Sequence, residues 1–265
     1  MNPISIDDPD DPRLDPYRSL KATNLTRGRS EFIVEGRRLV ERLLSSRHRA
    51  LSVLALEREI PRMSALLGEG VATYTAAPEL LSRLVGFPFH QGVLGHGRRE
   101  PDPSLEEILG RPNRLGLVVC PRLTNPENLG AIARIADVFG LDAVLVGPSC
   151  PDPFSRRVLR VSMGAVLGLP VVEMNDPPAL ADRLIESRRI EIWGAVADPG
   201  ASPHDMVTPP ERFALVLGEE DQGLELPWLD RCHRLVTIPM RSGASSLNVA
   251  VAAGVLLERL TRPWR

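Results

Sequence analysis

LGLVVCPRLTNPENLGAIARIADVFG, residues 115–140, is the clearest strand-to-helix unit in this chain of 265 residues. Its first six residues form an apolar run, which is typical of a strand buried on both faces of a parallel sheet. Asn125 is a favoured N-cap residue and Pro126 a favoured first helical residue. A helix is therefore predicted over 127–139, and Gly140 ends it.

The alternation of strands and helices continues to the C-terminus. Strands are predicted over 143–146, 170–172, 190–197, 213–217 and 235–238, and helices over 154–163, 179–187 and 246–260. This order indicates an α/β domain with a mostly parallel sheet covered on both faces. Ser245 suits the N-cap of the last helix, which is apolar nearly all round from Leu247 to Leu257. Such a helix is expected to be buried by the sheet and by a second subunit.

Composition divides the chain into four segments. Residues 1–15 contain five Asp and one Arg, and are expected to form a disordered acidic tail. Residues 16–97 have the mixed pattern of a small α/β domain. Residues 98–112 contain three prolines and are interpreted as a linker. Residues 113–265 form the larger α/β domain described above.

The net charge of −2 hides a basic segment. Residues 16–99 carry fourteen basic and seven acidic side chains, and Lys21 is the only lysine of the chain. The planar guanidinium of Arg can bond two phosphate oxygens at once, so this segment could contact a polyanion. A GC-rich genome would give the same Arg bias without any function.

Several classes of protein are excluded by composition. No apolar run reaches the eighteen residues of a membrane span. The three cysteines lie far apart without C-x-x-C spacing, so neither a disulfide framework nor a zinc site is indicated, and a reducing cytoplasm fits. The five histidines form no recognisable metal cluster. Neither the P-loop pattern nor the dinucleotide-binding glycine pattern is present.

Three loops at predicted strand ends carry the candidate functional residues. They are Asn125–Arg134, Leu217–Gly223 and Ile238–Asn248. Ligands of α/β proteins bind at the carboxyl ends of parallel strands, where all three loops begin. Each loop alone could equally be a helix cap or a plain turn.

Together the three loops resemble the three motifs of the SpoU family, also called the TrmH family, of RNA ribose 2′-O-methyltransferases. Residues 125–140 match N-P-x-N-x-G-A-x-x-R-x-A-x-x-F-G, residues 217–223 match L-G-x-E-x-x-G, and residues 238–249 match I-P-M-x-x-x-x-x-S-L-N-V. RVSMGA at 160–165 matches a linking segment of the family. Residues 30–96 are similar to the small L30e-like domain that precedes many members, with Glu35-Gly36 and His90-Gln91-Gly92 as the matching points.

The resemblance implies an α/β domain with a deep trefoil knot, preceded by an L30e-like domain that binds the RNA substrate. It implies S-adenosylmethionine as methyl donor, no metal, and a homodimer whose active site uses both subunits. The N-terminal domain favours ribosomal RNA, because the tRNA-specific members tend to lack it.

The resemblance also implies roles for individual residues. The catalytic set would be Arg134, Asn128, Glu219, Ser246 and Asn248, and the cofactor would contact Leu217, Gly218, Ile238, Met240, Ser246 and Leu247. Arg134 corresponds to the arginine proposed as the base, but a guanidinium with a pKa above about 12 is a poor base. Its role is therefore either that of a base acting through a phosphate or water, or that of an electrostatic clamp on the 2′-oxygen.

Three other functions are weighed against this one. A tRNA methyltransferase would share the same motifs. A non-catalytic RNA-binding or ribosome-assembly factor could keep the fold, but the intact set of site residues argues against it. A different α/β enzyme with a nucleotide cofactor would be expected to carry a glycine-rich fingerprint, which is absent.

Overall fold

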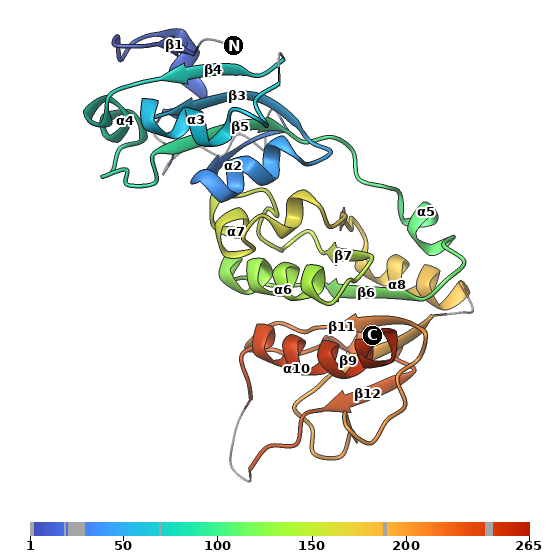
Figure 1. Cartoon of the computed structure of the whole chain (residues 1–265). Coiled ribbons are helices and arrows are strands. Elements are labelled where there is room, and N and C mark those ends of the chain that lie inside the picture. The colour runs from blue at the N-terminus through green and yellow to red at the C-terminus, as the bar shows by residue number, and fades with distance from the viewer. Residues whose placement is uncertain (1–2, 19, 21–29, 69, 188–189, 242–245) are drawn as a thin grey trace. The chain divides into compact units, whose positions relative to one another are not determined.

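The computed structural model describes residues 3–18, 20, 30–68, 70–187, 190–241 and 246–265. The chain divides into two compact units. Unit 1 comprises Met1–Pro101 and Phe154–Gly168, and unit 2 comprises Asp102–Pro153 and Leu169–Arg265. Figure 1 labels the elements of both units.

Unit 2 is built on a seven-stranded sheet whose neighbouring strands are all parallel. The order across the sheet is β10-β12-β9-β11-β6-β7-β8. The strands are β6 (Leu115–Cys120), β7 (Ala143–Val146), β8 (Val171–Glu173), β9 (Glu191–Ala195), β10 (Ser202–Pro203), β11 (Arg212–Val216) and β12 (Arg234–Thr237). The predicted α/β fold with a mostly parallel sheet is confirmed.

Helices α6 (Pro126–Val138), α8 (Pro177–Glu186) and α9 (Leu226–Leu229) each connect two of these strands, since parallel strands need crossover connections. Helix α5 (Leu105–Leu109) precedes β6, and α10 (Val249–Thr261) follows β12 and is followed by a 3₁₀ turn, η4 (Arg262–Trp264). Helices α6 and α10 pack together, and a Cβ at Gly254 would lie 3.7 Å from Ile135 Cδ1. The last helix begins at Val249 with Asn248 as N-cap, and the Ser245 predicted for this role lies outside the described residues.

Unit 1 contains a five-stranded mixed sheet in the order β1-β4-β3-β5-β2. Its strands are β1 (Ile4–Ser5), β2 (Glu31–Glu35), β3 (Arg49–Ala55), β4 (Ala72–Thr75) and β5 (Val93–Arg98). Its helices are α2 (Arg37–Leu44), α3 (Ile60–Met63), α4 (Pro78–Val85) and α7 (Arg156–Val161), with 3₁₀ turns η1 (Pro12–Tyr17), η2 (Glu57–Glu59) and η3 (Ala165–Leu167).

The acidic N-terminal segment is folded where the structure describes it, so the expected disordered tail is wrong over residues 3–15. Strand β1 pairs in parallel with β4, and Ile6, Leu14 and Tyr17 belong to the core of unit 1. The Tyr17 hydroxyl lies 2.6 Å from Ser52 Oγ, and burial raises the pKa of Tyr17. Amino-acid composition did not predict this folding, because only a few apolar residues anchor a segment that is otherwise acidic.

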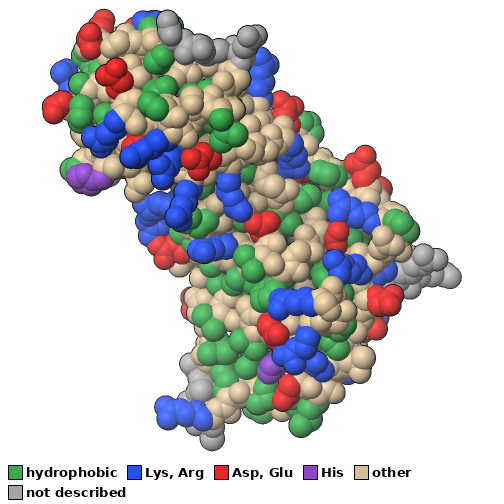
Figure 2. Space-filling model, in the orientation of Figure 1, with side chains coloured by type: hydrophobic (Ala, Val, Ile, Leu, Met, Phe, Trp, Pro, Cys, Tyr) green, Lys and Arg blue, Asp and Glu red, His purple; other side chains and the backbone are tan. Residues whose placement is uncertain are grey.

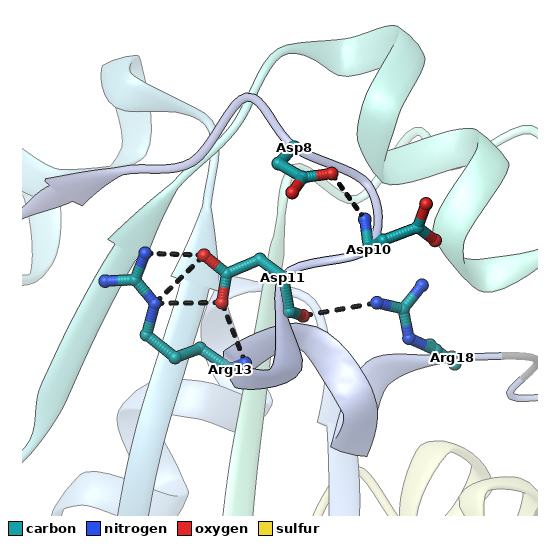
Figure 3. A network of polar contacts seen from close by, with 5 residues as sticks. All are labelled: Asp8, Asp10, Asp11, Arg13 and Arg18. Atoms are coloured by element: carbon teal, nitrogen blue, oxygen red, sulfur yellow. Dashed lines mark hydrogen bonds and ion pairs between the residues drawn. The ribbon is translucent and has the colours of Figure 1, made fainter.

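Two acidic residues of this segment, Asp8 and Asp11, accept local hydrogen bonds (Figure 3). Asp11 caps η1 by accepting from the Arg13 N–H at 2.9 Å, and its carboxylate also pairs with the Arg13 guanidinium. These hydrogen bonds lower the pKa of Asp11 to about 2. Arg18 donates to the Asp11 carbonyl at 3.2 Å. The bonds of Asp11, whose side chain is 13% exposed, therefore order the turn.

The segment 154–168 belongs to unit 1, although the whole of 113–265 was expected to form one domain. The Phe154 ring centroid lies 5.1 Å from those of both Phe32 and His48, and the Arg156 guanidinium pairs with Glu35. The segment carries the apolar and charged groups that complete this face of unit 1. Contacts between residues so distant in sequence produce no local pattern, so the sequence did not predict them.

We predict that Leu14→Ala lowers the free energy of unfolding by about 2 to 4 kcal/mol, because it leaves a cavity where Leu14 is fully buried. Urea denaturation followed by circular dichroism measures this. Ile4→Ala is the control, since Ile4 is 47% exposed. An unchanged stability of Leu14→Ala would mean that the N-terminal segment is not part of the core.

Candidate active site

The candidate site lies at one edge of the unit 2 sheet. Strands β6, β11, β9 and β12 are consecutive neighbours and run in parallel, so their carboxyl ends share this edge. The segments that follow β6, β11 and β12 contain the three candidate loops found in the sequence. In α/β proteins, ligands bind where two neighbouring strands connect to opposite sides of the sheet. Strand β6 connects to β7 on one side, and its other neighbour, β11, connects to β12 on the opposite side. This switch point therefore lies between β6 and β11, at the candidate site.

Three side chains from these loops form a hydrogen-bonded chain. Asn248 Nδ2 donates to Asn128 Oδ1 at 3.0 Å, and Asn128 Nδ2 donates to Glu220 Oε1. Asn128 is buried, at 7% exposure. Asn248 Oδ1 accepts from the N–H groups of Ala250 and Val251 at 2.9 and 3.3 Å, which caps α10. We call Asn128, Glu220 and Asn248 the site triplet.

The second carboxylate oxygen of Glu220 is buried and bonded to no residue that the structure describes. An unpaired buried acceptor is costly, and it is retained mainly where a ligand or substrate group meets it. Glu220 also lines the cavity described next.

A cavity of about 540 Å³ opens beside the site triplet. This volume lies in the range of small-molecule sites. All six residues expected to contact the cofactor line it, namely Leu217, Gly218, Ile238, Met240, Ser246 and Leu247. Val249, Ala252 and Leu256 of α10 add apolar surface, and the turn from Glu219 to Gly223 adds polar groups.

Gly218 has a steric reason to be glycine. A Cβ at this position would lie 2.3 to 2.6 Å from backbone atoms of Gly223 and Leu224. The turn that follows β11 is therefore closed on itself, and the hydrogen bonds between Glu219 and Gly223 fix it. The backbone of this turn forms one wall of the cavity.

Comparisons with known proteins identify the family. Residues 116–258 match the family model of the SpoU rRNA methylase family. The chain belongs to the SpoU rRNA methylase family. The family predicted from the three motifs is thereby confirmed.

Individual relatives agree over most of the chain. An uncharacterised tRNA/rRNA methyltransferase of Mycobacterium bovis is 35% identical, over 96% of this chain and 90% of its own. The 23S rRNA (guanosine(2553)-2′-O)-methyltransferase RlmP of Bacillus subtilis is 30% identical, over 86% of this chain and 88% of its own. The SpoU methyltransferase AviRb of Streptomyces viridochromogenes, solved with AdoMet, is 26% identical with a TM-score of 0.78, over 96% and 98% of the two chains.

The structure places Glu220, not the predicted Glu219, in the triplet. Glu219 pairs instead with Arg122, at 3.2 Å, and that arginine also lies 3.7 Å from Glu225. The SpoU motif L-G-x-E could have identified the correct residue, because its fourth position falls on Glu220. Arg122 was also missed, and no motif position marks it. It ties the loop after β6 to the turn after β11.

Arg134 is exposed on α6 and makes no hydrogen bond or ion pair with a described residue. It lies six residues beyond Asn128, which is about 9 Å along a helix axis. Arg134 does not line the cavity, whereas Ser246 does and Asn248 belongs to the triplet. The predicted catalytic set is thus only partly assembled within this chain.

The thiols near the site are not poised to react. Burial raises the pKa of Cys120, which ends β6, well above its usual value, and it also raises the pKa of Cys150. Thiols of raised pKa remain protonated and are weak nucleophiles. Among the residues that the structure describes, no group of three or more His, Cys, Asp and Glu side chains is placed to bind a metal.

We predict that Glu220→Ala lowers the rate of methyl transfer to rRNA by about 100-fold, because Asn128 loses the acceptor that orients it. Glu219→Ala, the matched control, should lower it by less than about tenfold, since Glu219 pairs with the half-exposed Arg122 and does not bond to Asn128 or Asn248. Single-turnover kinetics with labelled S-adenosylmethionine measure both. A larger loss in Glu219→Ala would contradict the assignment of Glu220.

Proposed function

We propose that this protein transfers the methyl group of S-adenosylmethionine to a ribose 2′-hydroxyl of ribosomal RNA. The observation that carries the proposal is the site triplet beside the cavity, with Glu220 belonging to both. Membership of the SpoU rRNA methylase family supports the reaction type. The names of the 23S rRNA 2′-O-methyltransferase relatives support the substrate.

The cavity has the features that S-adenosylmethionine requires. Ile238, Leu247 and Leu256 supply apolar surface for the adenosine, and the tight turn at Gly218 leaves backbone groups within reach of its polar edge. Glu219, Glu220 and Asp221 add negative charge to the lining, which suits a cationic ligand. When bound, the cofactor supplies a methyl group on a positively charged sulfonium, already activated for attack by oxygen.

The site triplet would position the ribose. Because Asn128 and Asn248 are locked by each other and by Glu220, their orientation is fixed before substrate arrives. The unpaired oxygen of Glu220 can accept a hydrogen bond from a substrate hydroxyl. Ser246, at the cavity, would contact the same region.

Arg134 would act as an electrostatic clamp on the reacting 2′-oxygen. A guanidinium remains charged in proteins, so it stabilises the developing negative charge better than it removes a proton. Its exposed position away from the cavity favours action in the site of a second subunit. The homodimer implied by the family resemblance would supply that subunit.

We propose that α10 forms part of the dimer contact. Val251 and Val255 lie four residues apart on one face of this helix and are 53% and 36% exposed. Exposed β-branched residues at this spacing suit a self-complementary contact of two identical helices.

We also propose the remaining features of the family pattern. The larger domain would contain the deep trefoil knot, formed by the loops that follow β11 and β12, and unit 1 would include the L30e-like domain that binds RNA. The bacterial relatives support a cytoplasmic location. As a separate finding, no helix among the described residues is both long and apolar enough to cross a membrane.

We predict that the Arg134→Ala variant loses methyl-transfer activity by about 1,000-fold or more. The variant should still bind S-adenosylmethionine as the unmodified protein does. Tritium transfer to separate pools of unmodified rRNA and tRNA, followed by digestion to nucleosides, measures the reaction. Calorimetry measures cofactor binding. We expect a labelled 2′-O-methyl nucleoside from rRNA.

Label only in tRNA would support the alternative substrate. Cofactor binding without transfer to either pool, by the unmodified protein, would point to a ribonucleoprotein substrate. Absence of both transfer and cofactor binding would favour the non-catalytic function. A normal rate in Arg134→Ala would refute the role given to this residue.

Val251→Glu should convert the dimer to a monomer and lower methyl transfer by about 100-fold, because a buried unpaired charge is unfavourable in an apolar contact. Sedimentation equilibrium measures the mass. Ile185→Glu, on α8, is the control, since Ile185 is also partly exposed, at 38%. A monomeric protein with full activity would refute the dimer.

A further inference from the structure

The linking segment RVSMGA has no part in the site described above, yet it lines a second cavity. This cavity, of about 420 Å³, lies within unit 1. Arg160 and Met163 contribute to it from the linking segment, and Gly36, Arg37, Arg38 and Arg62 from the N-terminal part of the chain. We call it the arginine cavity.

The arginine cavity carries an excess of positive charge. Four arginines line it, against the two carboxylates of Glu35 and Glu59. Both carboxylates are engaged, Glu35 by Arg156 and Glu59 by Arg62 at 3.1 Å. The guanidinium groups of Arg38 and Arg160, in contrast, form no ion pair with a described residue. Two cations are therefore available to an anion.

Backbone donors add to this charge. Helix α2 begins at the arginine cavity with Gly36 as its N-cap and without a side-chain cap. Its first backbone bonds are those of the Leu39 and Val40 N–H groups to the Gly36 carbonyl. The N–H groups of the preceding two residues have no acceptor within the helix, and the positive end of the helix dipole also favours an anion. Gly36 has φ of +88°, and a Cβ there would lie 2.8 Å from Gln91 Oε1.

The linking segment is held in a strained conformation at this cavity. It ends α7 with a Schellman turn, in which Gly164 N–H bonds to the Leu159 carbonyl at 2.9 Å and Met163 N–H to the Arg160 carbonyl at 3.1 Å. Met163 occupies the left-handed position of this turn, with φ of 53°, where glycine is usual. Arg42 donates to its carbonyl at 2.8 Å. Strain of this kind concentrates at functional positions.

We propose that the arginine cavity binds phosphates of the RNA backbone, an inference that rests on the proposed function. Guanidinium pairs and helix N-termini are the groups that hold phosphate. No aromatic side chain is among the lining residues, so the cavity lacks an aromatic stacking platform for bases, and we expect the contact to position the RNA without reading its sequence. Arg side chains gather over the region of α2 and α7 on the face shown in Figure 2.

The test compares two double variants of the full-length protein. Arg38→Ala/Arg160→Ala removes the two available cations of the cavity. Arg49→Ala/Arg83→Ala is the control, because it removes the same charge from exposed positions of unit 1 outside the cavity. Thermal unfolding checks that both variants fold, and filter binding to an in vitro 23S rRNA transcript at several salt concentrations measures affinity.

The cavity variant should raise the Kd for the transcript about tenfold or more. It should also reduce the slope of log K against log salt by about two, one for each lost phosphate contact. The control should stay within about threefold of the unmodified protein, and both variants should bind S-adenosylmethionine normally. Equal losses in the two variants, or none in the cavity variant, would overturn the proposal.

Two further arms separate the other outcomes. If the unmodified protein methylates the transcript while the cavity variant binds it normally, the cavity proposal fails and the proposed function stands. If the unmodified protein neither binds nor methylates rRNA, the proposed function fails and this inference with it. If inorganic phosphate at matched ionic strength raises the Tm of the unmodified protein alone and RNA affinity is equal in all three proteins, the cavity binds free phosphate instead, which overturns the proposal.

Discussion

The carboxamide of Asn248 is the interaction on which the geometry of the site depends. Its oxygen accepts two backbone N–H groups at the start of α10, and its nitrogen donates to Asn128 on α6. A carboxylate could cap the helix but could not donate, and a hydroxyl could not span both contacts in the same way. The helix cap therefore fixes which way the amide faces, and the amide fixes Asn128. Glu220, from the loop after β11, accepts from Asn128 and completes the chain of hydrogen bonds.

This chain of hydrogen bonds is effective because the sheet brings its members together. Asn128, Glu220 and Asn248 are up to 120 residues apart in sequence, yet each follows a strand of one parallel sheet. Strand β11 inserts between β6 and β9, which places Glu220 between the other two loops. Each neutral bond contributes only about 0.5 to 1.5 kcal/mol, but linked bonds in a partly buried setting reinforce one another. These hydrogen bonds therefore contribute more to fixing the geometry of the site triplet than to the free energy of unfolding.

Local patterns in the sequence predicted the elements of unit 2 well. The apolar run at 115–120 and the cap at Asn125 appear as β6 and the start of α6, within a residue of their predicted bounds. The six cavity residues were found through motif positions. The error at Glu219 had a different origin, since two adjacent glutamates offer the same chemistry and only the fourth position of the motif L-G-x-E separates them in the sequence. The fold of the N-terminal segment escaped prediction because its burial depends on partners such as Ser52, far along the chain.

The path of the chain between the units has a consequence for how this protein is made. Residues 154–168 complete unit 1, but they are flanked on both sides by residues of unit 2. During synthesis the first 101 residues therefore emerge long before the segment that covers Phe32 and pairs with Glu35. Unit 1 reaches its final packing only after about a third of unit 2, residues 102–153, has been translated. The two units are not interchangeable modules, and recombination that exchanged one alone would separate α7 from the surface it evolved to cover.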